Sequence, residues 1–71
     1  MIFSKQLRLV REKLLLSQEM MARELGVSFA TISRLENNHT EPSLATRRSF
    51  IEFCERENII LANFEMEGKP E

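Results

Sequence analysis

The chain has 71 residues, a net charge of −1 and 42% hydrophobic residues, values typical of one small globular domain. Its single cysteine excludes an intramolecular disulfide, and no apolar run approaches the roughly 20 residues that a bilayer-spanning helix needs. The first residues lack the long apolar core of a signal peptide, so we expect a cytoplasmic protein without membrane contact.

The charge is unevenly distributed. Residues 1–54 contain eight Lys or Arg and six Glu, a net charge of +2, whereas residues 55–71 contain two Lys or Arg and five Glu, a net charge of −3. The body of the domain is therefore mildly basic, and the acidity lies in the tail. A negative net charge argues against nucleic-acid binding, but that charge comes from the tail and not from the body of the domain.

The first predicted helix spans residues 4–13. Phe3, Leu7, Val10 and Leu14 recur at helical spacing and form its inward stripe. Serine residues mark the starts of three further helices, because Ser17, Ser28 and Ser43 can each accept a hydrogen bond from an amide of the following turn.

The second and third helices are short and are joined by a tight turn at Gly26, where we expect a positive φ. The fourth helix is predicted from Leu44 to about Glu57, with Asn58 as its C-terminal cap. Its predicted apolar positions are Leu44, Phe50, Ile51, Phe53 and Cys54. The place of Cys54 in this pattern favours a buried hydrophobic residue over a reactive thiol.

The C-terminal segment alternates apolar and polar residues from Ile60 to Met66, which predicts a half-buried strand. We expect Ile59 and Leu61 to pack against the fourth helix, while Ile60, Phe64 and Met66 form an apolar row. An open strand edge of this kind is seldom left uncovered. The chain thus divides into a domain of residues 1–58 and a strand and tail of residues 59–71. The strand either pairs with its twin in a homodimer or folds over its own helices.

The segment from Ser17 to Asn38 resembles the helix-turn-helix of the phage repressor and Cro family, also called the XRE type. The resemblance covers residues 7 to 61, and the matching positions are Ser17, Gln18, Ala22, Leu25, Gly26, Val27, Ser28, Thr31, Ile32, Ser33, Leu35, Glu36, Pro42 and Ser43. Met21 departs from the usual Leu, a swap that cores tolerate. Asn38 departs from the usual Gly, and Asn tolerates the left-handed conformation better than most residues. The resemblance implies an all-α, lambda-repressor-like fold of four to five helices with a short C-terminal β-strand.

The resemblance also implies a DNA-binding surface, with the helix around residues 28–36 in the major groove. Its implied residues are Gln18, Ser28, Phe29, Ala30, Thr31, Ser33, Arg34, Asn37, Asn38 and His39. Arg34 can donate two hydrogen bonds to a guanine edge, and Phe29 and Ala30 can pack on thymine methyl groups. Phe29 is also compatible with a protein partner or with a place in the core, and Arg34 with a solvated charge.

Gln18 resembles the family's phosphate-clamping glutamine. The loop of Asn37, Asn38, His39 and Thr40 is polar and could bind a second phosphate cluster, with a merely solvated side chain as the alternative for His39. Arg11 and Glu36 occupy positions that often pair in the family, linking the first helix to the end of the third. The alternative is two independent surface charges.

No chemistry beyond binding is indicated. The chain has no Asp, one His, one Cys and no Gly-rich loop, so we expect no enzyme activity, no cofactor and no metal. The resulting interpretation is a sequence-specific transcriptional regulator, of the repressor kind by resemblance, that binds double-stranded DNA as a homodimer. The alternative is a protein-interaction module, such as an antitoxin or adaptor, that uses the same fold.

Overall fold

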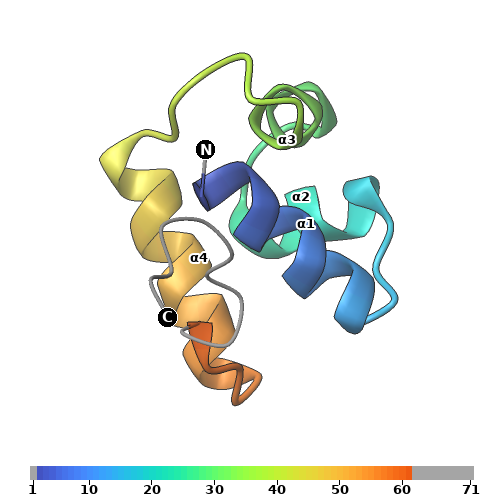
Figure 1. The fold of residues 1–71 in the computed structure, drawn as a ribbon, viewed down its shortest axis with the longest axis vertical. Helices are drawn as coiled ribbons and strands as arrows, with labels where there is room; N and C mark the ends of the chain where they lie inside the picture. Colours follow the sequence, from blue (N-terminus) through green and yellow to red (C-terminus); the bar gives the residue numbers. More distant parts are fainter. Residues whose placement is uncertain (1, 62–71) are drawn as a thin grey trace, which may run out of the picture.

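The computed structural model describes residues 2–61, which form four α-helices around one core (Figure 1). They are α1 (Ile2–Lys13), α2 (Gln18–Leu25), α3 (Phe29–Glu36) and α4 (Leu44–Arg56). The predicted all-α fold is confirmed, and α1 begins two residues earlier than expected. No helix in this range has the length and apolar character needed to cross a bilayer.

Three helices begin at the predicted serines. The Oγ atoms of Ser17, Ser28 and Ser43 each accept a hydrogen bond from the backbone amide three residues later, at 3.0–3.1 Å. Each serine has extended backbone geometry. These side chains satisfy amides that the first helical turn leaves without an intrahelical partner, so the helix starts are fixed by local chemistry.

All four helices end in the same way. A residue in the left-handed conformation follows each helix: Leu15 (φ 59°), Gly26 (φ 72°), Asn38 (φ 61°) and Asn58 (φ 60°). The next amide along the chain donates to a carbonyl five residues earlier, at 2.8–3.0 Å. This pattern is the Schellman motif. It confirms the positive φ predicted for Gly26 and the end expected at Asn58.

The core combines residues from all four helices. Its members are Phe3, Leu7, Val10, Met21, Ala22, Leu25, Ile32, Leu35, Phe50, Phe53 and Cys54. The predicted stripe of the first helix is therefore confirmed, with Leu14 packed at its edge. Phe3 and Phe50 meet edge to face with ring centroids 5.2 Å apart, which joins α1 to α4.

The predicted apolar positions of α4 were partly wrong. Leu44 is 72% exposed and Ile51 is 41% exposed. These two residues are seven apart and share the side of the helix that faces away from Phe50 and the rest of the core. Thr46 is buried instead, and its Oγ1 lies 3.0 Å from the Oγ of Ser43, so the buried hydroxyl has a hydrogen-bond partner.

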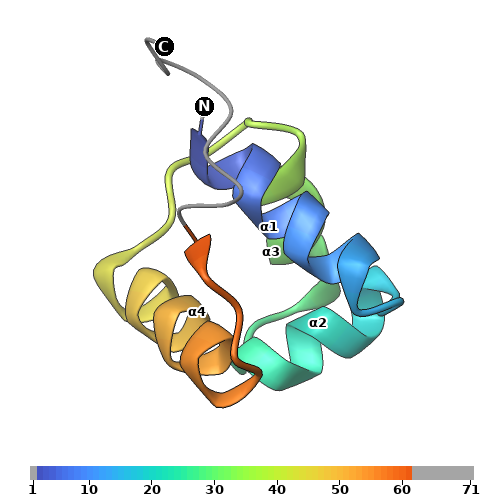
Figure 2. The same ribbon diagram turned by 60° about the horizontal axis from the view of Figure 1, so that its bottom comes forward.

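The end of α4 closes the bottom of the core (Figure 2). Cys54 is buried there, as predicted, and its burial raises the pKa of the thiol to about 11. Ile59 and Leu61 pack against the core, as predicted, while Ile60 is exposed. Residues 60 and 61 are not in a strand, and the rest of the strand expected over residues 60–66 lies outside the described residues.

We expect Gly26→Val to destabilise the domain by about 1–3 kcal/mol, because a β-branched residue is strained at a φ of 72°. A Cβ at this position would meet no atom within 4 Å, so the cost is one of backbone conformation and not of a clash. Gly26→Asn should cost less, since Asn tolerates this region. Urea unfolding measures both, and equal stability of the Val variant and the parent would contradict the turn geometry.

Leu15→Gly should have the opposite effect and stabilise the domain by about 1 kcal/mol. Leu15 adopts a left-handed backbone that glycine adopts without strain, and 89% of its surface is exposed, so little packing is lost. Thermal melts of the variant and the parent provide the measurement. Leu16→Gly is the matched control and should destabilise, because Leu16 packs against the core. A lower melting temperature for Leu15→Gly would show that the strain argument fails.

Candidate nucleic-acid interface

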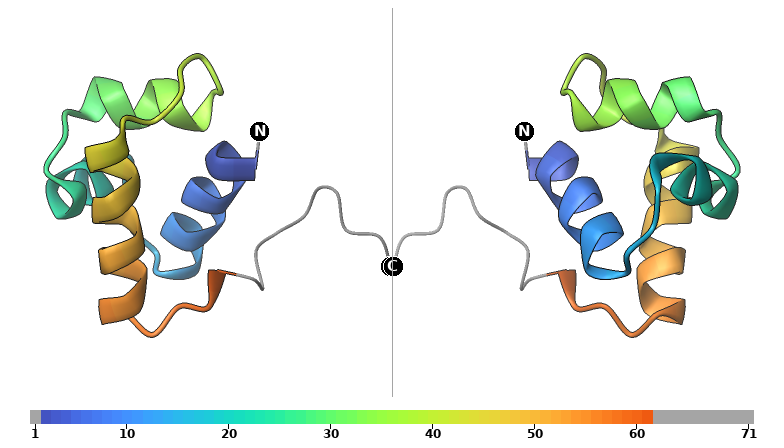
Figure 3. Two further views of the ribbon diagram at one scale, coloured as in Figure 1. Left: turned by 90° about the vertical axis from the view of Figure 1, so that its left-hand side faces the viewer. Right: turned by 90° about the vertical axis from the view of Figure 1, so that its right-hand side faces the viewer.

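Helix α3 lies along one end of the molecule and leaves one side uncovered (Figures 1 and 3). Its inner side contacts α1 and α2, through Ile32 and Leu35, which are both buried. Gly26 and Ser28 set the tight turn that leads from α2 into α3. Because α3 packs on two other helices, its outer residues form an exposed convex surface with a fixed orientation.

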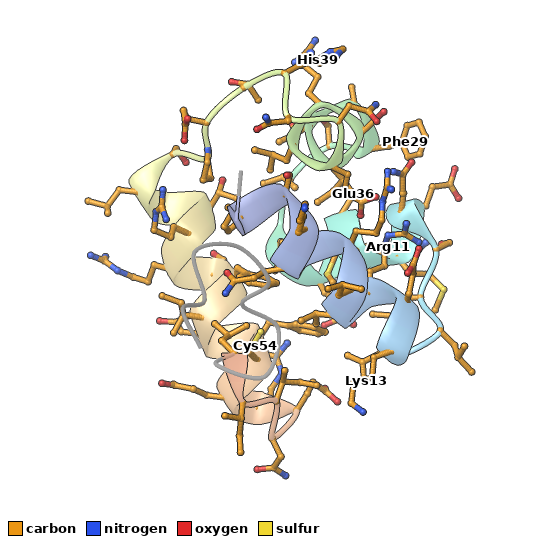
Figure 4. All side chains as sticks on the ribbon, in the orientation of Figure 1. Arg11, Lys13, Phe29, Glu36, His39 and Cys54 are labelled. Carbon is orange, nitrogen blue, oxygen red and sulfur yellow. The ribbon has the colours of Figure 1, made fainter. Side chains whose placement is uncertain are left out.

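The outer surface of α3 carries the residues that sequence analysis proposed. Phe29, Ala30 and Arg34 are exposed, and Thr31 and Ser33 are half-buried. The Phe29 ring is 52% exposed and points away from the body in Figure 4, so a place in the core is ruled out. The structure therefore groups small, apolar and cationic side chains on one accessible face.

The carboxylate of Glu36, at the last position of α3, is completely buried. Arg11 from α1 donates from Nε to Oε2 at 2.6 Å and from Nη2 to Oε1 at 3.0 Å. Gln18 from α2 donates from Nε2 to Oε1 at 2.9 Å. The predicted pair of Arg11 and Glu36 is confirmed, and the view in Figure 4 shows the two side chains meeting below α3.

Arg11 links three parts of the structure. Its Nη1 donates to the carbonyl oxygen of Leu16, at the corner between α1 and α2, at 2.9 Å. The hydrogen bonds to Glu36 raise the pKa of Arg11 above its ordinary value. The guanidinium thus fixes the end of α1, the entry to α2 and the end of α3 relative to one another, which sets the direction in which α3 points.

Sequence analysis assigned Gln18 to a phosphate, and the structure adds a second contact for it. Gln18 is half-buried at the first position of α2, and one of its two amide hydrogens is directed to Glu36. The other remains available to a ligand.

Arg8, which sequence analysis did not select, brings its Nε to 3.8 Å from the same Glu36 oxygen and is half-exposed. The signal for Arg8 was its spacing of three residues from Arg11, which puts both on one side of α1.

Other proposed residues lie at the two ends of α3, where they take part in the start and the end of the helix. The Oγ of Ser28 lies 2.9 Å from the Oγ1 of Thr31, within the cap of α3. Asn37, Asn38 and His39 form the exposed turn after α3, where the backbone amide of His39 donates to the carbonyl of Arg34. In Figure 4, His39 lies at the outer edge of the molecule, at the same end as α3.

A shallow cleft of about 320 Å³ separates α3 from the loop that leads to α4. Its lining residues are Val27, Thr31, Arg34, Leu35, Thr40, Glu41, Pro42, Ser43 and Thr46. Arg34 therefore forms part of one wall of this cleft. The sequence did not indicate this cleft, because its walls come from two segments whose packing depends on the whole fold.

Comparison with known proteins agrees with this geometry. A family model described as Helix-turn-helix matches residues 7–49, a span that runs from the middle of α1 through α2 and α3 into the first part of α4. No curated protein and no solved structure matched the chain.

We expect Arg11→Met to destabilise the domain by about 3–5 kcal/mol, because it leaves the buried Glu36 carboxylate without its cation. The double variant Arg11→Met/Glu36→Leu should recover at least about 1 kcal/mol relative to the sum of the two single changes. Denaturant unfolding of the four proteins measures this coupling. Glu24→Gln, which breaks the exposed pair with Arg56, is the control and should change stability by less than about 0.5 kcal/mol. Additive single effects would contradict the buried pair.

Proposed function

Because the chain belongs to the XRE-type helix-turn-helix family of DNA-binding regulators, we propose that it recognises a specific sequence in double-stranded DNA with α3 in the major groove. The observation that carries the proposal is the exposed face of α3 on a helix whose direction is fixed by the buried Arg11–Glu36 pair. A reading helix needs this combination, since base contacts demand a defined orientation.

The base contacts follow from side-chain chemistry. Arg34 can donate two hydrogen bonds to a guanine edge, and the exposed Phe29 and Ala30 can pack on thymine methyl groups. Ser33, whose hydroxyl group can donate or accept, suits several bases. We assign sequence discrimination mainly to Arg34, because bidentate pairs contribute most to base choice.

Phosphate contacts position the domain. The second amide hydrogen of Gln18, at the start of α2, can donate to a phosphate oxygen, and helix N-termini favour anions. The exposed turn of Asn37, Asn38 and His39 supplies further polar donors on the other side of α3. We propose these two groups as clamps on the DNA backbone.

We further propose that the protein acts as a homodimer on a pseudo-palindromic site. One domain of this size reads only a few base pairs, and a two-fold dimer doubles the recognised length. The C-terminal segment 59–71 was the dimerisation element suggested by the sequence, and the exposure of Ile60 is compatible with that role.

A second candidate function, a protein-interaction module, rests on the exposed apolar side chains of Phe29 and Met20. Large exposed apolar groups are often protein contacts. The two functions differ in salt dependence, because a DNA binder with several phosphate contacts loses affinity steeply as salt rises, whereas an apolar protein contact does not.

Selection of bound sites from a random duplex pool, followed by fluorescence anisotropy on the selected site, tests the DNA proposal. Arg34→Ala should weaken binding by about 1–3 kcal/mol and relax base choice at one position. Arg56→Ala is the matched control. Arg56 lies at the end of α4, where it pairs with Glu24, and its loss should leave affinity unchanged. Enrichment of no sequence, or equal binding by the Arg34 variant and the parent, would overturn the proposal.

A further inference from the structure

The buried Glu36 carboxylate has a second arginine beside it. Arg11 and Gln18 already donate three hydrogen bonds to its two oxygens. Arg8, which lies one turn before Arg11 on α1, brings its Nε to 3.8 Å from Oε1, which is an ion pair but is beyond hydrogen-bonding distance. Two arginines therefore face one carboxylate, and these three side chains together carry one positive charge in excess.

The guanidinium of Arg8 is open to a further acceptor. Its side chain is 51% exposed, and its Nε is the atom that approaches the carboxylate. The two Nη groups, which carry four of the five N–H bonds of a guanidinium, make no hydrogen bond within residues 2–61. Such a group can contact a phosphate through two parallel N–H donors.

Arg8 and Gln18 converge on one atom from two different helices. The Nε2 atom of Gln18 donates to the same Oε1 of Glu36 that Arg8 approaches, so a single phosphate group can contact both side chains. In Figure 4, Glu36 and Arg11 lie below α3, on the side of the molecule where Phe29 begins that helix. Arg8 and Gln18 are therefore placed beside α3 and not at the far end of α1.

We propose that Arg8 and Gln18 together bind one phosphate of the DNA backbone next to α3. Arg8 supplies the positive charge and two N–H donors from its Nη groups, and Gln18 supplies the amide hydrogen that Glu36 does not use. The inference rests on the proposed function and deepens it, because it adds a cation to a clamp that otherwise consists of a neutral glutamine. Arg8 then provides the electrostatic part of backbone binding on this side of α3.

The other cations of α1 provide a contrast. Arg11 is enclosed by its bonds to Glu36 and Leu16, so its guanidinium has a structural role. Lys13 is exposed at the opposite end of α1, far from α3 in Figure 4. Loss of the charge of Lys13 therefore serves as a matched control for loss of the charge of Arg8, on the same helix and of the same sign.

Fluorescence anisotropy of the full chain on its selected duplex, between about 50 and 200 mM salt, tests the contact. Arg8→Gln should weaken binding about tenfold at the lower salt and reduce the slope of log affinity against log salt by about 1. Its preference for the selected site over a single-base variant should stay the same, since a phosphate carries no sequence information. Arg8→Lys, which keeps the charge, and Lys13→Gln should both retain the slope of the parent.

A second measurement identifies the phosphate. Phosphates of the selected duplex are replaced one at a time by neutral methylphosphonates, and binding is measured for each duplex. The parent should lose affinity at one position at which Arg8→Gln loses little more. Gln18→Ala should be insensitive at the same position, because effects of groups in direct contact are not additive.

The outcomes separate this inference from the proposed function. A parental salt slope in Arg8→Gln would overturn the shared phosphate site, as would different methylphosphonate positions for the Arg8 and Gln18 variants. Reduced base discrimination in Arg8→Gln would overturn it too, since Arg8 would then act through the orientation of α3. In each case, sequence-selective binding by the parent leaves the proposed function standing, whereas a parent that binds no duplex contradicts the proposed function itself. Thermal melts equal to that of the parent show that the variants are folded.

Discussion

The burial of one carboxylate governs the arrangement of the first three helices. Removing an ion such as the Glu36 side chain from water costs several kcal/mol unless its oxygens are paired and hydrogen-bonded. Arg11 and Gln18 supply those bonds from α1 and α2. Any movement of α3 that broke them would leave the charge buried and uncompensated, so the direction of α3 is coupled to the packing of the domain.

Much of the fold could be predicted from the sequence because the helix boundaries depend on local chemistry. A serine oxygen reaches the amide three residues later whatever the rest of the chain does, and Gly26 and Asn58 suit a left-handed backbone wherever they occur. Leu44 and Ile51 were misassigned because hydrophobicity alone does not give the phase of a helix about its axis. Leu15 gave no local signal, since leucine seldom adopts a positive φ.

The candidate site, like the fold, could be predicted from the sequence only in part. The pair of Arg11 and Glu36 was expected from the family resemblance, and the outward position of Phe29 and Arg34 from the period of a helix. The hydrogen bond from Gln18 to Glu36 joins residues 18 positions apart on different helices, and only the packed structure reveals it. The contacts of these residues with DNA are chemical assignments that the sequence and the exposed face of α3 both support.

The shortness of α2 and α3 has a consequence for the dynamics of recognition. Each has eight residues, whereas isolated helices below about 12–15 residues are marginal in water. Helix α3 therefore depends on the core for its stability, and we expect the amides on its buried side to exchange with solvent mainly when that core opens. A DNA site that binds α3 then acts as a ligand of the entire fold and suppresses global opening by mass action.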